Sequence, residues 1–222
     1  MVDLSTLRFR IKLLRLLVAI FLITLTVRPA SAHPHAWIDV SVQVLFDLAG
    51  NVTGLREYWL LDEFYTAFAL ESYSTAGAPP DQGDIEKLMH QNMKNLSEHT
   101  YFTKVFYEKK EIKLGQVTEM SSTLRGSRLA MEFTVSFAEA INLDGKILSY
   151  QIYDPTYYIE VLHAQTDDAI NLIEAPVGCH YRLIALKPTL EAIARAASLD
   201  RTQSGGDGLG AFFSERVEVT CS

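Results

Sequence analysis

The sequence predicts an α+β, β-rich domain with antiparallel, sandwich-like sheets built from hairpins and two or three helices. Three observations lead to this fold class. Apolar residues alternate with polar residues in several segments, turn-forming residues separate neighbouring segments of this kind, and only three short stretches show helical spacing. A two-lobed α/β solute receptor would instead show repeated strand–helix alternation, which this chain lacks.

The first 32 residues have the three parts of a secretory signal peptide. Basic residues start the segment, an apolar run follows over residues 16–27, and Ala30-Ser31-Ala32 supplies the small residues that a signal peptidase reads. The run has twelve residues, fewer than the ~20 that a membrane-spanning helix needs. We therefore expect cleavage after Ala32, export to the periplasm, and a single domain over residues 33–222. An uncleaved membrane anchor is the alternative.

The charge of the chain bears on its partners. The full sequence carries −7, and residues 1–32 contain five basic residues and one acidic residue, so the mature domain carries −11. Such a surface repels nucleic acids and anionic lipid head groups and suits cations or a basic partner. We expect no nucleic-acid partner.

Strands account for most of the domain. Residues 36–46 alternate between apolar and polar side chains, residues 47–51 are turn-forming, and residues 52–61 form the returning strand of a hairpin. A one-residue error in the register of this hairpin would move Glu57 from one face to the other. The same signals predict further strands at 101–107, 111–114, 117–124, 129–137, 146–153, 157–163, 181–186 and 216–221.

Helical spacing of apolar residues predicts three helices. They cover residues 64–73, with Asp62 as the N-cap, residues 84–98, and residues 188–198. In the third helix, we expect Leu190, Ile193 and Ala197 to face inward.

The two cysteines, Cys179 and Cys221, both belong to the mature domain. An even number of cysteines in an oxidising compartment favours a disulfide, and two cysteines permit one intramolecular pairing. A thiolate metal site is the alternative, although neither cysteine has a neighbour in the spacing typical of such sites.

The start of the mature domain carries the best candidates for metal binding. His33 would have a free α-amine as well as an imidazole, His35 follows two residues later, and Asp39 shares the strand face of His35 by parity. A hairpin turn near residues 49–50 would bring Asp62 and Glu63 beside His35. Nitrogen and carboxylate donors of this kind suit copper, zinc or nickel rather than calcium. Alternatively, the histidines form a frayed polar end, Asp62 is only an N-cap, and Asp39 is only a solvated strand residue.

Several segments resemble, in order and spacing, a bacterial family known as domain of unknown function 1007. The resemblance covers nearly the whole mature domain. Members of this family are described as the periplasmic component of an uncharacterised ABC-type transport system and are often associated with nickel/cobalt exporter-like membrane proteins. The resemblance therefore implies a periplasmic role with a transition metal. The segments that carry it are His33-Pro34-His35-Ala36-Trp37-Ile38-Asp39, Trp59-Leu60-Leu61-Asp62-Glu63-Phe64-Tyr65, Asn92-Met93-Lys94-Asn95-Leu96, Tyr153-Asp154-Pro155-Thr156-Tyr157-Tyr158, Gly178-Cys179, and Leu209-Gly210-Ala211-Phe212-Phe213.

We expect a non-enzymatic accessory protein that binds a divalent transition metal (Ni, Co, Zn or Cu) and serves a membrane metal transporter. Sequence signatures of hydrolases, nucleotide-binding enzymes and zinc proteases are missing. The first alternative is a copper-dependent redox enzyme with an N-terminal histidine brace, although the short spacing from His33 to His35 argues against it. The second alternative is an interaction domain without metal.

Overall fold

The computed structural model describes residues 12–15, 34–73, 80–185, 187–200 and 203–222. The chain divides into two units, residues 1–31 and residues 32–222. In the first unit, the description covers a helical turn at residues 12–15, so most of the expected signal peptide, its cleavage site and His33 lie outside the described residues. No helix within the described part of the chain has the length and apolar character needed to cross a bilayer.

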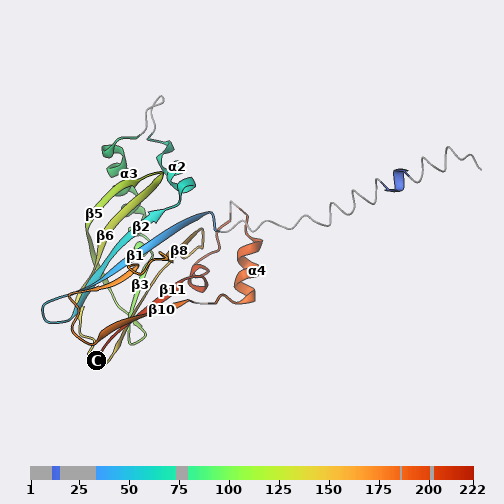
Figure 1. Ribbon diagram of the computed structural model, residues 1–222. Coiled ribbons are helices and arrows are strands. Elements are labelled where there is room, and N and C mark those ends of the chain that lie inside the picture. The colour runs from blue at the N-terminus through green and yellow to red at the C-terminus, as the bar shows by residue number, and fades with distance from the viewer. Residues whose placement is uncertain (1–11, 16–33, 74–79, 186, 201–202) are drawn as a thin grey trace, which may run out of the picture. The chain divides into compact units, whose positions relative to one another are not determined.

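The second unit has the α+β, β-rich architecture that the alternation predicts (Figure 1). Two sheets make up most of it, and antiparallel pairing dominates both. The first has the order β5-β6-β2-β1-β8, with β9 also paired to β1, and the second has the order β10-β11-β7-β3-β4. The strands are β1 (Ala36–Phe46), β2 (Val52–Leu61), β3 (Thr103–Tyr107), β4 (Lys110–Glu111), β5 (Leu114–Arg125), β6 (Arg128–Ile141), β7 (Ile147–Ile152), β8 (Ile159–His163), β9 (Ile170–Ile173), β10 (Cys179–Ala185) and β11 (Glu215–Cys221).

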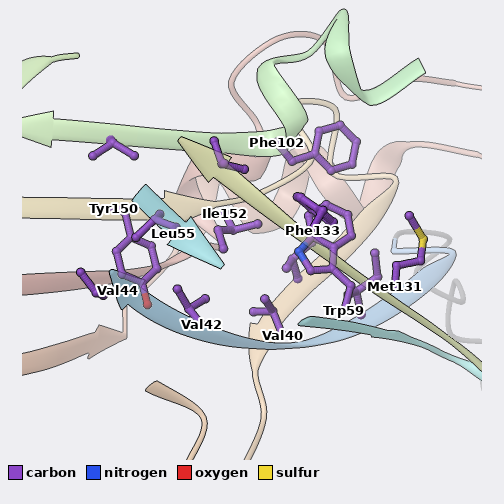
Figure 2. Close-up of a cluster of buried hydrophobic side chains, with 14 of the residues drawn as sticks. Val40, Val42, Val44, Leu55, Trp59, Phe102, Met131, Phe133, Tyr150 and Ile152 are labelled. Carbon is purple, nitrogen blue, oxygen red and sulfur yellow. The ribbon is translucent and has the colours of Figure 1, made fainter. Parts of the chain in front are cut away.

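The β1–β2 hairpin forms where the alternation predicts it. Ile38 pairs with Leu61 and Val44 pairs with Leu55. Alternate residues of β1 are buried, and Figure 2 shows Val40, Val42 and Val44 in one buried cluster with Trp59 and Tyr150. The register turns Glu57 of β2 inward, where its side chain is completely buried.

Two strands depart from the antiparallel expectation. Both β8 and β9 pair with β1 in parallel. The turn at residues 154–156 carries the chain from β7 in the second sheet to β8 in the first, so it is a crossover between sheets and not a hairpin. The prediction missed β9, because four residues are too few to show a clear alternation.

The three predicted helices are present as α2 (Glu63–Glu71), α3 (Gln82–Ser97) and α4 (Leu190–Ser198). Asp81 begins α3 through a capping box with Asp84, and Thr189 caps α4. Two short 3₁₀ turns, η1 (Thr100–Phe102) and η2 (Gly210–Phe212), complete the fold.

The inward face predicted for α4 is wrong. Leu190 is 85% exposed and Ile193 is 45% exposed, and Ala197 is exposed as well. The helix instead buries Ala192 and Ala196 in a small cluster with Tyr157 and Leu209. Alanine side chains allow the helix to approach this cluster closely, and apolar spacing alone does not show which of two apolar faces meets the protein.

Candidate functional site

His35 occupies a defined position at the start of β1. Its backbone N–H donates to the carbonyl oxygen of Tyr158 at 2.8 Å, and its ring lies 4.7 Å from the ring of Tyr158 between centroids. The next residue, Ala36, pairs with Ile159 at the beginning of β8. His35 is half-buried. The parallel pairing of β1 with β8 therefore fixes both the backbone and the imidazole of His35 against Tyr158.

Tyr158 is itself held by a turn built around the buried carboxylate of Asp154. The two Asp154 oxygens accept hydrogen bonds from the backbone N–H groups of Thr156, Tyr158 and Ile159 and from the Thr156 hydroxyl, at 2.8–3.0 Å. The aromatic-rich segment 153–158 is therefore a rigid turn, and its Tyr157 ring stacks on Phe213 at 3.9 Å between centroids.

Asp62 precedes α2, and its carboxylate accepts hydrogen bonds from backbone N–H groups. Asp62 Oδ1 accepts from the N–H groups of Phe64 and Tyr65 at the start of α2, both at 2.9 Å, and Oδ2 accepts from the N–H of Trp37 at 2.8 Å. The Asp62 N–H donates back to the Trp37 carbonyl. The carboxylate therefore caps α2 and ties its start to β1. Glu63 follows in the first turn of α2 and is exposed.

Asp39 points to the outer face of the first sheet and forms an ion pair. Its Oδ2 accepts from Arg128 Nη2 at 2.7 Å. Arg128 also donates to the carbonyl oxygens of Leu60 and Leu61, each at 2.8 Å. The guanidinium thus joins the ends of β1, β2 and β6, and it occupies an Asp39 oxygen that a metal would need.

These contacts decide how well the expected donor set fits a metal ion. Within the described ranges, no group of three or more histidine, cysteine, aspartate or glutamate side chains is arranged to hold a metal. Asp39 is paired with Arg128, and Asp62 is used by backbone N–H groups. A metal at this edge would therefore depend on the segment His33-Pro34-His35, of which Pro34 and His35 are described.

The expected disulfide is present. Cys179 and Cys221 are directly paired in the antiparallel ladder of β10 and β11, and their sulfurs are bonded at 2.00 Å. The bond fixes the last strand of the domain to its neighbour. Because both sulfurs take part in it, neither cysteine is a thiolate metal ligand in this structure.

Two buried polar bridges between the sheets were not singled out from the sequence. In the first, Glu57 of β2 accepts from Thr103 Oγ1 of β3 at 2.8 Å and from Trp59 Nε1 at 2.9 Å. Burial raises the pKa of Glu57 from 4.5 to about 7, although both hydrogen bonds act in the opposite direction. The register of the β1–β2 hairpin, which decides whether Glu57 points inward, was the sequence signal that could have indicated this bridge.

The second bridge centres on His163 of β8. His163 Nδ1 lies 2.8 Å from Glu215 Oε2, and His163 Nε2 lies 3.2 Å from the hydroxyl of Tyr150. Burial alone would raise the pKa of Glu215, but the hydrogen bonds and charge of His163 outweigh it and leave the pKa lowered. Burial is the main cause that raises the pKa of Tyr150, and the nearby charge of Glu57 is the second. These contacts satisfy polar groups inside the sandwich, as a buried network requires.

The remaining described histidines lie outside the candidate site. His90 is exposed on α3, and His180 contacts Thr220 Oγ1 across the β10–β11 ladder at 2.9 Å. His99 follows α3 and lies near Phe102.

Comparisons with known proteins place the whole domain in context. Residues 18–221 match the model of a family described as "Protein of unknown function (DUF1007)". The chain is also similar to an uncharacterized protein of Haemophilus influenzae (strain ATCC 51907 / DSM 11121 / KW20 / Rd), with 27% identity over 193 residues that cover 86% of this chain and 91% of the relative.

Proposed function

The chain belongs to the family of proteins of unknown function designated DUF1007, and we propose that its mature domain, residues 33–222, binds a transition-metal ion in the periplasm and serves a membrane metal transporter. The ion is nickel, cobalt, zinc or copper, and it is cargo rather than a catalytic cofactor. The donors are the imidazoles of His33 and His35 together with the α-amine that cleavage after Ala32 would create.

The position of His35 carries this proposal. Its backbone bond to Tyr158 and the contact between the two rings hold a nitrogen donor in place before any metal arrives. A donor with a fixed position loses less conformational freedom on binding, which favours affinity. The formal charge of −11 on residues 33–222 also raises the local concentration of cations.

An exposed pair of aromatic side chains on α2 supports the partner half of the proposal. Phe64 is 85% exposed and Phe68, one helical turn later, is 71% exposed. The helix begins directly after Asp62, whose backbone pairs with Trp37. Figure 1 shows α2 near the start of β1, the strand that His35 directly precedes. Exposed aromatic pairs are typical of protein contact sites. The helix carries glutamates at both ends and no basic residue, so it suits an apolar partner surface with basic residues around it.

Metal titration tests the first half of the proposal. Calorimetry on protein whose N-terminus has been verified by mass spectrometry should show saturable binding of about one equivalent of at least one of the four metals. His35→Ala should weaken this binding by at least about tenfold, or about 1.4 kcal/mol. His90→Ala is the matched control, because His90 is exposed on α3.

The partner half has a separate test. A photo-crosslinking residue at position 64 in living cells should give an adduct that mass spectrometry identifies as a membrane metal transporter. Phe68→Ser in that background should abolish the adduct and leave metal affinity unchanged. Leu190→Ser removes an exposed apolar side chain from α4 instead and should leave the adduct unchanged. An unchanged adduct with Phe68→Ser would contradict this contact surface.

A further inference from the structure

Three of the segments that carry the family resemblance meet around one cavity, which the metal proposal does not use. The cavity has a volume of about 170 Å³. Ile38 comes from the first segment, Trp59 and Tyr65 from the second, and Asn92 and Asn95 from the third, and all of them line it. Segments far apart in the chain thus contribute to a single hollow between the first sheet and α3.

The inner walls of the cavity are apolar. Trp59 and Met131 are register partners on β2 and β6, each 2% exposed, and the Trp59 ring stacks on Phe102 with 6.1 Å between centroids (Figure 2). The Trp59 N–H is already donated to Glu57. The walls therefore offer a ligand contact surface but no hydrogen-bond donor from the indole.

Polar groups gather on the α3 side. Asn92 is half-buried, and its amide nitrogen makes a weak contact with Met131 Sδ at 4.0 Å. Asn95 accepts from Gln91 through its amide oxygen, which leaves its amide nitrogen as a donor. His99 is exposed, and among the described residues its ring nitrogens have no hydrogen-bond partner. The cavity therefore has an apolar interior and hydrogen-bonding groups along one side, the usual composition of a small-molecule site.

The backbone beside the cavity is held in an unfavourable conformation. Thr100, Tyr101 and Phe102 all have left-handed φ angles, at 57°, 55° and 59°. A non-glycine residue in this region is energetically unfavourable, because its Cβ lies too close to the following carbonyl oxygen. Such strain occurs preferentially at ligand sites, where the surrounding structure maintains it. Here it places Phe102 against Trp59, and His99, which directly precedes the strained residues, also lines the cavity.

We propose that this cavity binds a small, single-ring aromatic compound that carries one hydroxyl or amino group. The volume selects the size of the ligand, because a cavity of about 150 Å³ is enough for benzene. The apolar walls would enclose the ring, and the polar group would face Asn92 and His99. This inference is independent of the metal proposal.

Phenol and toluene are the probes, because they differ by one hydrogen-bonding group. Calorimetry and amide chemical shifts should show saturable binding of phenol to the wild-type protein at one site, with the shifts concentrated in α3, η1 and the ends of β2 and β6. Asn92→Leu should weaken phenol binding by about fivefold or more and leave toluene binding within about twofold. Leu96→Trp adds volume at a half-buried wall position and should reduce the binding of both probes at least about tenfold.

Leu190→Trp on α4 is the control for the added indole and should bind both probes as wild type does. Circular dichroism establishes that each variant is folded, and if Leu96→Trp fails to fold, the comparison of phenol with toluene in Asn92→Leu still decides. Absence of saturable phenol binding to the wild type would overturn the proposal. Equal phenol affinity in wild type and Asn92→Leu would also overturn it.

Discussion

Glu57 offers a quantitative test of the buried polar core. Its side chain is fully buried, and burial raises its pKa from 4.5 to about 7. The folded state therefore holds this proton more tightly than the unfolded state. The stability that the protonated carboxyl provides is fully present below about pH 4.5, and it is lost as the pH rises to about 7. Above that pH, the folded protein contains a buried carboxylate whose two hydrogen-bond donors among the described residues, Thr103 and Trp59, are uncharged.

Glu57→Gln removes this titration while keeping the size and the hydrogen-bonding capacity of the side chain. One pKa unit corresponds to about 1.4 kcal/mol. The unfolding free energy of Glu57→Gln minus that of the wild type should therefore be about 2–3 kcal/mol larger at pH 8 than at pH 5. Urea denaturation at both pH values measures this shift. Comparing variant with wild type at each pH cancels the contributions of other titrating groups.

The matched control for this experiment is Glu132→Gln. Glu132 lies on the adjacent strand β6, opposite Tyr58, and its side chain is exposed. Its substitution should change the free energy of unfolding by less than about 0.5 kcal/mol, as exposed surface substitutions usually do. A Glu57→Gln effect that is the same at pH 5 and pH 8 would refute the argument that a titrating buried carboxyl lies between the sheets.

Three further predictions concern stability. Loss of the Cys179–Cys221 disulfide, which links positions 42 residues apart, should lower the free energy of unfolding by about 4 kcal/mol, as measured by urea denaturation of the double serine variant. Gly210→Ala should destabilise the domain by more than about 2 kcal/mol in the same assay, because the new Cβ would collide with the Asp154 carbonyl oxygen. Lys109→Gly should raise the thermal unfolding midpoint and increase the free energy of unfolding by about 0.5–1 kcal/mol. Lys109 is exposed and has a φ of 69° in the turn between β3 and β4, a conformation that glycine adopts without steric cost.

Each of these predictions has a control. Reductant should destabilise the wild type and leave the double serine variant unchanged. Gly83→Ala, in the first turn of α3, places the new Cβ 3.2 Å from the capping side chain of Asp81 and not against a backbone carbonyl, so it should destabilise the domain far less than Gly210→Ala does. Lys110→Gly removes a neighbouring lysine whose φ is not in the left-handed region, so it should not stabilise. A Gly210→Ala protein as stable as wild type, or a gain for Lys110→Gly equal to that for Lys109→Gly, would contradict the backbone arguments.

Local patterns predicted the elements of the fold well. The strands at 36–46 and 52–61 match β1 and β2, because a half-buried strand repeats every two residues and that period is visible in the sequence. Asp62 as the N-cap of α2 is also confirmed. The disulfide was predictable because two cysteines permit one intramolecular pairing.

Features that depend on distant partners were not predictable in this way. The ion pair between Asp39 and Arg128 joins residues 89 positions apart, and no local pattern shows it. The buried face of α4 depends on the surface formed by Tyr157 and Leu209, which the helix sequence does not contain. For the candidate site, the hairpin prediction placed the start of α2 at the beginning of β1, where Asp62 contacts Trp37, but it did not show that Asp39 and Asp62 are already committed to structural contacts.

Metal titration of the processed protein tests the central claim most directly. With the N-terminus at His33 verified, the account predicts saturable uptake of about one equivalent of nickel, cobalt, zinc or copper, weakened at least about tenfold by His35→Ala and unchanged by His90→Ala. A correctly processed protein that takes up none of these metals at neutral pH would contradict the account. Equal affinities of wild type and His35→Ala would contradict it as well.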